Sequence, residues 1–389
     1  ALAAAFVCLA MLDGILALSP AAAQLPSEVT EPFHGVTSDG ELQEGLFPVR
    51  ATGVTTEPVV EAARNLRSVL DSDQRRQATF SLDSDEWRHW ANFPQLERRG
   101  VPLRQMTDAQ REAALDLVRA GLSARGFRQA RDIMEVAGYV QELMDDPDIY
   151  GEWLYYISLF GEPHSSEPWG WQIDGYHLVV NYFVMGDQVV MTPAFWGIEP
   201  ADIDEGPLAG TEVLQEEEAD GRALMRALTP EQRAQARIDD DKTGNDILAT
   251  AFQDNRVMEY EGLRADRMSP EQREILLEVI GNYVNNLKEG HARLKMEQVR
   301  EHLDETRFAW IGGFDEDDVF YYRVQSPVIL IEFDHTVPVV LDPGDPPRPS
   351  RQHIHSVIRT PNGNDYGKDL LRQHYEEAEN DPNHDHGDG

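Results

Sequence analysis

One short phrase that starts helices occurs four times in this chain and limits its possible folds more than any other feature. In each copy an apolar residue precedes a capping residue, and Gln-Arg follows at a fixed offset. The copies are LDSDQR at 70–75, MTDAQR at 106–111, LTPEQR at 228–233 and MSPEQR at 268–273. The capping side chain can accept hydrogen bonds from free backbone amides, and the glutamine can bond back to the cap. The phrase predicts four helix starts, although its copies are spaced too unevenly for a solenoid.

Apolar residues continue at helical spacing after two of these starts, along 115–122 and along 275–287. We therefore expect helices to dominate residues 57–147 and 212–305. Side chains at this spacing form one apolar stripe on each helix, and such a stripe must be buried against another element of structure.

Two other segments, 169–196 and 319–341, are rich in β-branched and aromatic residues. The first contains Gly186-Asp187 and the second Ser326-Pro327, which are turn signals, so each segment predicts a hairpin. A further strand is expected at HIHSVIR, residues 353–359. Because hairpins alternate with helical blocks, we predict an α+β fold with an antiparallel sheet built from hairpins and covered by several amphipathic helices.

Composition divides the rest of the chain. Residues 24–56 are rich in Pro, Gly, Thr and Ser and are interpreted as a linker, and 57–376 as a single α+β domain. The end, 377–389, has the acidic and His-rich composition of a disordered tail. Residues 1–23 form an Ala-rich apolar run that closes on an A-x-A-like site, which indicates a signal peptide and an exported, periplasmic or extracellular protein.

Cysteine and charge exclude several classes of function. The only cysteine, Cys8, lies within the predicted signal peptide, so the processed protein has no disulfide and no thiolate ligand. We expect no membrane span after processing. The 34 basic and 70 acidic residues give a net charge of -36, which argues against nucleic acid as a partner. No phosphate-binding or dinucleotide motif is present, so no nucleotide cofactor is expected.

Histidines beside the strand-rich segments are the candidate metal ligands. His353 and His355 form an H-x-H pair, and residues two apart on a strand share a face and can converge on one ion. His177 and His335 continue apolar strand faces; each by itself is typical of a hydrogen-bonded core residue. Together the four imidazoles could bind zinc, iron, copper or manganese without any thiolate. His164 is left open as a further ligand, as is His374 in the last helical segment.

Other side chains near these strands have two interpretations each. Arg359 shares the face of the H-x-H pair and could bind a carboxylate or phosphate, or could pair with an acidic neighbour. Asp365 could orient an imidazole or cap the following helix. Trp169 and Trp171 could wall a ligand pocket or pack in the core. The segment DDDKTGND at 239–246 lacks the twelfth-position glutamate of a calcium loop and predicts an acidic surface loop.

The combined phrases resemble the domain-of-unknown-function 3500 family from roughly residue 57 to 376. They are WGWQIDGYHLVVNYFVMGDQVVMTPAFWG, TRFAWIGGF, YYRVQSPVILIEFDH and HIHSVIRTPNGNDYGKDLLRQH, with the Gln-Arg helix starts. The family often has Gly-His-His where this chain has Gly175-Tyr176-His177, so only the second histidine is carried over. The resemblance implies an architecture and an exported location, and it marks candidate residues without assigning them roles. These candidates are His177, Arg323, His335, His353, His355, Arg359, Asp365 and His374.

The leading hypothesis is an exported metal-dependent enzyme. In it, His177, His335, His353 and His355 bind the ion. Arg359 or Arg323 binds an anionic group of a small organic substrate, and Asp365 supports the site. Zinc or manganese would lead to hydrolysis, and iron or copper to oxidation. The alternatives are a non-catalytic ligand-binding protein that uses the aromatic residues, and a metal-handling protein that uses the histidines and the tail.

Overall fold

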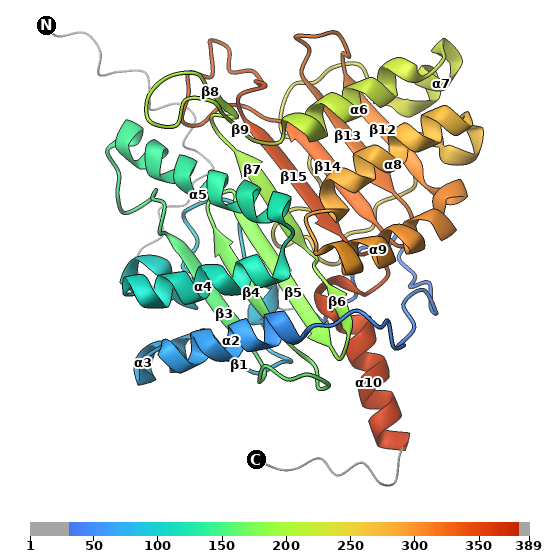
Figure 1. The fold of residues 1–389 in the computed structure, drawn as a ribbon. Helices are drawn as coiled ribbons and strands as arrows, with labels where there is room; N and C mark the ends of the chain where they lie inside the picture. The colour runs from blue at the N-terminus through green and yellow to red at the C-terminus, as the bar shows by residue number, and fades with distance from the viewer. Residues whose placement is uncertain (1–30, 381–389) are drawn as a thin grey trace, which may run out of the picture.

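The computed structural model describes residues 31–380 and shows an α+β fold (Figure 1). The predicted signal peptide, and the part of the predicted tail beyond residue 380, lie outside the described residues. The helices are α2 (Glu57–Val69), α3 (Ser72–Ala78), α4 (Asp108–Gly121), α5 (Ala124–Met144), α6 (Gln215–Ala227), α7 (Pro230–Ala236), α8 (Pro270–Val284), α9 (Glu289–Glu301) and α10 (Lys368–Asn380). The predicted helical blocks are thus confirmed.

One large sheet runs through the whole molecule. Its strands are β1 (Thr79–Phe80), β2 (Val101–Pro102), β3 (Tyr155–Phe160), β4 (Trp169–Gly175), β5 (Leu178–Met185), β6 (Gln188–Val190), β7 (Ala194–Ile198), β10 (Arg237–Asp239), β11 (Leu263–Arg264), β12 (Arg307–Gly312), β13 (Phe320–Gln325), β14 (Leu330–His335) and β15 (Ile354–Arg359). A separate small pair consists of β8 (Asp202–Ile203) and β9 (Thr211–Glu212). The main path is β1-β3-β4-β5-β7-β15-β14-β13-β12-β10. The sheet is mostly antiparallel, as predicted, with parallel pairs at β1–β3 and β10–β12.

The Gln-Arg phrases start α3, α4, α7 and α8, and each forms a complete capping box. Their glutamines also meet in pairs. The side-chain amide of Gln110 donates to Gln74 at 2.7 Å, and that of Gln272 donates to Gln232 at 2.9 Å. The phrase therefore does more than start helices, because each pair of copies joins two helix starts side by side.

These pairs reveal an internal duplication that explains the uneven spacing. One half contributes β1-β3-β4-β5-β7 to the sheet and the other β10-β12-β13-β14-β15, and the halves meet where β7 pairs with β15. In that central pair Trp196 lies opposite Ser356. These two residues, like the helix starts at 71 and 229 or at 107 and 269, are roughly 160 positions apart in the sequence. The four phrases are thus two copies of a pair rather than four copies of one unit.

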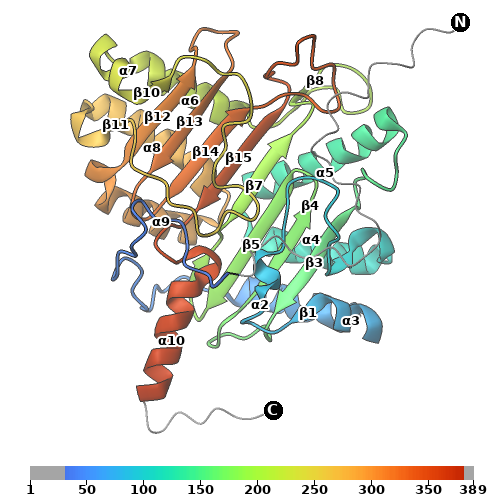
Figure 2. The same ribbon diagram turned by 180° about the vertical axis from the view of Figure 1, so that it is seen from behind.

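Helices α2 to α9 lie on one face of the sheet and loops cross the other, whereas α10 projects from one end of the molecule (Figures 1 and 2). The helix-side core includes Trp169 and Trp171, both fully buried, so these tryptophans pack in the core rather than wall an open pocket. The opposite face has a smaller cluster around Trp87, Phe195 and Val357. It is this loop-covered face that holds the candidate site.

Part of the predicted linker is packed onto the domain. Within residues 31–56, Val36 and Phe47 are buried, and the Thr52 N–H donates to the Asp187 carboxylate at 2.8 Å. Apolar side chains spaced through this Pro- and Gly-rich segment account for the docking, because they remove apolar surface from water. Within residues 31–380, no helix is both long and apolar enough to cross a membrane.

A candidate metal centre

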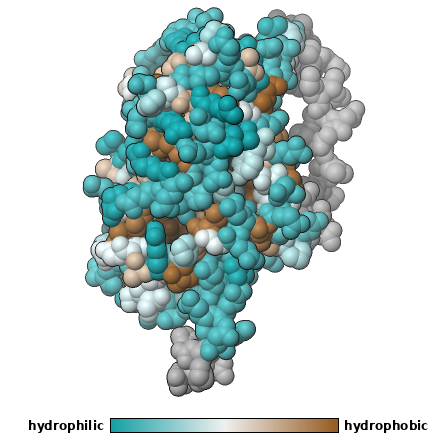
Figure 3. Space-filling view, turned by 90° about the vertical axis from the view of Figure 1, so that its right-hand side faces the viewer, coloured by the Kyte–Doolittle hydropathy of each residue, from teal (hydrophilic) through white to brown (hydrophobic). Residues whose placement is uncertain are grey.

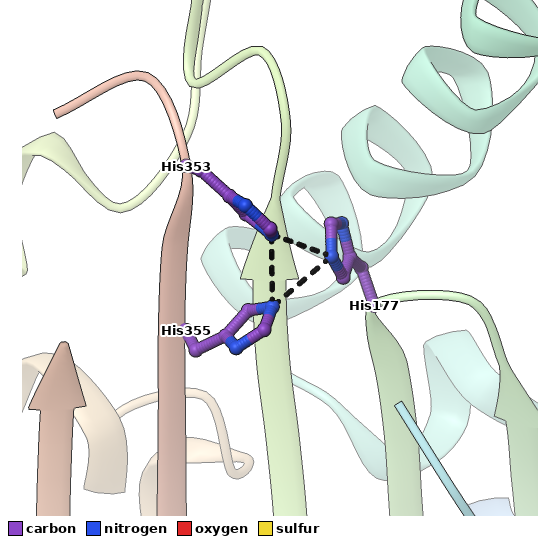
Figure 4. Close-up of side chains that lie close together, drawn as sticks. All are labelled: His177, His353 and His355. Atoms are coloured by element: carbon purple, nitrogen blue, oxygen red, sulfur yellow. Dashed lines mark hydrogen bonds between the residues drawn. The ribbon is translucent and has the colours of Figure 1, made fainter. Parts of the chain in front are cut away.

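Three imidazoles point toward one another at the upper edge of the loop-covered face (Figure 4). The Nε2 atoms of His353 and His355 are 3.0 Å apart, those of His355 and His177 are 3.2 Å apart, and those of His353 and His177 are 3.3 Å apart. His177 and His353 are almost fully buried, whereas His355 is partly exposed. Among the described residues, these three histidines are the group that could hold a metal ion.

The H-x-H pair converges as the strand geometry predicts. His353 directly precedes β15 and His355 is its second residue, so the two side chains lie on the same face. His355 is paired with Gly197 of β7, which has no side chain to occupy the space beneath the rings. A Cβ at Gly197 would lie 3.1 Å from His355 Cδ2 and 3.2 Å from His177 Cδ2. The glycine therefore lets both imidazoles lie close to the sheet.

His177 reaches the centre from a turn, not from a strand face. It lies between β4 and β5 with a φ of 61°, a left-handed conformation that costs energy for a residue with a side chain. Its N–H donates to the Asn92 carbonyl at 3.0 Å, and its own carbonyl accepts from Gly197 at 2.7 Å. The Tyr176 ring stacks on the imidazole with centroids 3.8 Å apart. These contacts hold the strained turn and aim the ring.

The spacing of the three nitrogens suits one transition-metal ion. Two nitrogens bound at about 2.0–2.1 Å lie about 3.3 Å apart in a tetrahedral site and about 3.0 Å apart in an octahedral one. The observed range of 3.0–3.3 Å covers both geometries. In either geometry three protein ligands leave at least one position for water or substrate, as catalytic sites require.

A second layer of polar groups orients His353. Its Nδ1 is 2.8 Å from the Val337 carbonyl, which can only accept, so Nδ1 carries the proton and Nε2 presents its lone pair to the centre. The Glu199 carboxylate lies 3.4 Å from the same Nδ1 and is fully buried. It accepts backbone N–H groups from Val339, Val340 and Leu341. Glu199 was not among the candidates from the sequence, where it is one of several acidic residues in 199–205.

The surroundings favour uncharged imidazoles. Burial, and then the neighbouring imidazoles of His355 and His353, hold the pKa of His177 well below its usual range. Burial, His353 and the Lys242 ammonium do the same for the pKa of His355. Burial also lowers the pKa of His353, although Glu199 opposes this shift. Neutral imidazoles keep lone pairs available at neutral pH, which is the form that binds metals.

His335 does not join the centre. In the β14–β15 ladder it lies opposite Ile354, so its side chain emerges on the helix side of the sheet, whereas His355 faces the loops. Its Nδ1 accepts the Phe320 N–H at 3.0 Å, and its Nε2 is 3.3 Å from a Glu218 carboxylate oxygen of α6. A shift of one residue along a strand reverses the face, and this separates His335 from the other three histidines.

Arg359 and Asp365 are deeply buried and bound to each other. Arg359 Nη1 donates to Asp365 at 2.9 Å and to Asp254 at 2.8 Å, and its Nε donates to the Ala249 carbonyl at 2.7 Å. Asp365 also accepts the Thr360 N–H at 2.8 Å. These carboxylates raise the pKa of Arg359 against the opposing effect of burial. The structure thus places this pair in an internal network, at the far end of β15 from His355.

The remaining candidates also have partners of their own. Arg323, on β13, is almost fully buried and pairs with Glu261 at 2.7 Å. His164 Nδ1 accepts N–H groups from the two residues Ser166 and Glu167. His374, on α10, has its Nε2 3.8 Å from a Glu167 oxygen. None of the three belongs to the group of converging imidazoles.

Lys242 and Asp334 border the centre and were not among the sequence candidates. Asp334 is paired with His355 across the β14–β15 ladder, and the Lys242 amine lies 3.1 Å from its carboxylate. Burial raises the pKa of Asp334 to about 7, although Lys242 opposes the shift. Lys242 is itself buried, so the segment 239–246 is not simply the acidic surface loop that its composition predicts. The sequence contained one hint of a special role for Lys242, because lysine is rare in this chain, which has four lysines and 30 arginines.

Comparison with known proteins agrees with the resemblance found in the sequence. A family model described as "Protein of unknown function (DUF3500)" matches residues 52–368. No curated protein and no solved structure matches the chain. The match covers most of the sequence and includes all three histidines of the centre, so the chain belongs to the DUF3500 family.

Proposed function

We propose that this protein is a metal-dependent enzyme whose centre consists of His177, His353 and His355. One observation carries the proposal: three Nε2 atoms, held on a sheet and an adjoining turn, lie 3.0–3.3 Å apart. Three lone pairs facing one another repel unless a cation or shared protons lie between them. An ion at that point would supply Lewis-acid or redox chemistry beside the partly exposed His355.

The residues around the ion would prepare it for catalysis. Val337 and Glu199 fix the tautomer of His353, and Gly197 lets the rings converge. Asp334 and Lys242, beside His355, are the ionisable groups placed to exchange protons with a small organic substrate. Arg359 and Arg323 already pair with the carboxylates of Asp365 and Glu261, so they do not bind an anionic group of the substrate.

The metal determines the class of reaction. Imidazole ligands suit zinc, iron, copper and manganese. With zinc or manganese the centre would activate water for hydrolysis, and with iron or copper it would oxidise an organic substrate. We also propose that the protein is exported, which the Ala-rich leader supports, so the ion would be acquired outside the cytoplasm; N-terminal sequencing of exported protein should then begin near Gln24.

Elemental analysis of protein purified without an affinity tag tests the centre. We expect about one equivalent of a transition metal per wild-type chain, and its loss in His353→Ala and His355→Ala. His164→Ala is the matched control, because this histidine lies outside the group, and it should keep the metal. Absence of stoichiometric metal from all of these proteins after incubation with each of the four ions would reject the proposal.

A screen of small ester, phosphoester and oxidisable substrates tests catalysis separately. Turnover should require the metal found by elemental analysis, disappear in His355→Ala and persist in His164→Ala. A stoichiometric metal that supports no turnover on any of these substrates would point instead to a non-catalytic metal-binding protein.

A further inference from the structure

A cavity lies at the end of the central strand β15 that is opposite the metal centre. It has a volume of about 460 Å³, within the range of small-molecule sites, and Ile358 and Thr360 at the end of β15 form part of its wall. Thr360 is five residues along the chain from His355, which corresponds to roughly 16 Å at about 3.3 Å per residue. The cavity is therefore separate from the centre of His177, His353 and His355.

The walls of this cavity are about half apolar and half polar. Side chains come from the packed segment before α2, from β6, from the end of α8, from α9 and from the start of α10. The apolar ones include Phe47, Val190, Met191, Val284, Leu287 and Leu370. Figure 3 shows the side of the molecule formed by α8 and α9, where hydrophobic groups interrupt a mostly hydrophilic surface above the projecting α10. Glu44, Arg50 and Glu301 also line the cavity, so charged groups accompany the apolar surface.

Lys295 on α9 is the group that gives this cavity a specific chemistry. Its amine donates to the Val328 carbonyl at 2.7 Å and to the Gln298 side chain at 3.0 Å, and it lies 5.8 Å from the Phe47 ring centroid. No carboxylate among residues 31–380 lies within ion-pair distance of it. Lys242, in contrast, has two aspartates within 3.1 Å. In a chain with twice as many acidic as basic residues, a half-buried lysine without an acidic residue at ion-pair distance is unusual.

We propose that this cavity binds a small apolar molecule with a single carboxylate, which pairs with the Lys295 ammonium while its apolar body lies against the walls. A monoanion fits because Lys295 is a single ammonium set into the wall, whereas Arg50, which also lines the cavity, is exposed to solvent. A dianionic phosphate would leave one charge without compensation inside the cavity. The Thr192 and Thr360 hydroxyls, 2.8 Å apart, and the Asn364 amide line the same space and can serve further polar groups.

Binding should be accompanied by proton uptake. Burial lowers the pKa of the Lys295 amine to about 7, although the Asp365 carboxylate, beyond ion-pair distance, opposes the shift. The amine is therefore largely neutral at pH 8. A bound carboxylate favours the charged amine and raises its pKa, so the amine takes up a proton as the ligand binds. An uncharged ligand of the same shape would not have this effect.

Isothermal titration calorimetry with decanoate, and with decanol as the uncharged probe, tests the proposal. We expect one decanoate per wild-type chain, an affinity at least tenfold lower in Lys295→Met, and little change for decanol. Lys288→Met is the matched control, because this exposed lysine is the N-cap residue of α9 and does not line the cavity. This variant should bind decanoate as the wild type does. Equal decanoate affinity in Lys295→Met and wild type, or no saturable binding, would overturn the assignment.

Two further measurements keep the result independent of variant folding and of the metal centre. Titrations of the wild type at pH 8 in buffers of different ionisation enthalpy should show uptake of close to one proton per decanoate. No uptake would contradict pairing with Lys295. Decanoate should also bind His355→Ala with unchanged affinity; loss of binding there would place the carboxylate at the metal centre instead.

Discussion

Gly197 sets how closely the imidazoles of the centre approach the sheet. It pairs with His355 across the β7–β15 ladder, and its N–H donates to the His177 carbonyl. One residue thus supports a histidine on the neighbouring strand and another in a turn. Gly197 contributes in two ways: it has no side chain where the rings of His177 and His355 converge, and its N–H bonds to the His177 carbonyl.

Replacing this glycine with alanine should separate the rings. In Gly197→Ala the new Cβ would lie 2.9 Å from the Phe195 ring and 3.1 Å from His355, closer than these groups tolerate without moving. We expect metal affinity to fall by about 10–100-fold, as for other changes behind a metal ligand, while the fold is kept. Competition titration with a chromophoric chelator measures the loss. Gly244→Ala, where the added carbon meets open space, is the control, and equal affinities in the two variants would contradict the role of Gly197.

Asp334 should make folding stability depend on pH. Its pKa is raised to about 7 in the folded protein from an ordinary value of 3.8, so the folded state holds a proton that the unfolded state releases between these values. Stability from this group is therefore complete at low pH and is lost as pH rises toward 7. Asp334→Asn should gain about 1–4 kcal/mol relative to wild type between pH 4 and pH 8.

Urea denaturation in the presence of a chelator, at several pH values, measures this difference. The Asn variant also loses the ion pair with Lys242, which forms only when Asp334 is ionised and therefore belongs to the same titration. The exposed Asp317→Asn serves as a control. A constant difference between Asp334→Asn and wild type across this pH range would show that the carboxylate does not titrate there.

At the scale of elements, the capping boxes hold the helices of each half in register with the sheet. Besides the paired glutamines, Arg111 donates to the Leu103 carbonyl at 3.1 Å and Arg273 to the Ala265 carbonyl at 2.8 Å, each in the short turn before its helix. The Gln-Arg phrase thus ties the helix start to the strand that precedes it. The same function in both halves explains why the phrase occurs as two pairs.

Removing one cap should destabilise the protein without affecting the centre. Ser269 accepts the Gln272 N–H at the start of α8, so Ser269→Ala should cost about 1 kcal/mol of unfolding free energy. Ser68→Ala removes an exposed hydroxyl within α2 and should lower the unfolding free energy by less. Chemical denaturation gives both values, and equal losses would mean that the cap does not contribute specifically.

At the scale of the whole molecule, the centre joins the two duplicated halves. His177 comes from the first half and His353 and His355 from the second, and the rings meet beside the central β7–β15 pair. A bound ion would therefore connect both halves of the sheet. The duplicated framework supplies two similar halves, yet the imidazoles occupy only one end of their junction.

Metal binding should stabilise the entire fold. Free zinc at 100 times its Kd should raise the unfolding free energy of the wild type by about 2.7 kcal/mol, because the ion binds the folded state preferentially. Scanning calorimetry with and without zinc should show a higher Tm for wild type and for His164→Ala. The Tm of His355→Ala should not rise, and a similar rise in this variant would place the zinc elsewhere.

The sequence by itself determined the local structure of this protein. Capping residues, helical periodicity and turn signals act over a few neighbouring positions, so they predicted the helix starts, the hairpins and the α+β class. The alternation of side chains along a strand likewise predicted that His353 and His355 converge. These features depend on backbone geometry that each segment carries with it.

Only the tertiary structure decided which distant residues meet. Strand order and register placed His335 on the helix side and brought His177 from a turn to the H-x-H pair. They also assigned Arg359 to a buried network, and Glu199 and Lys242 to the surroundings of the centre. Such pairings result from packing across many strands at once, where a shift of one residue reverses a face, and no short stretch of sequence contains that information.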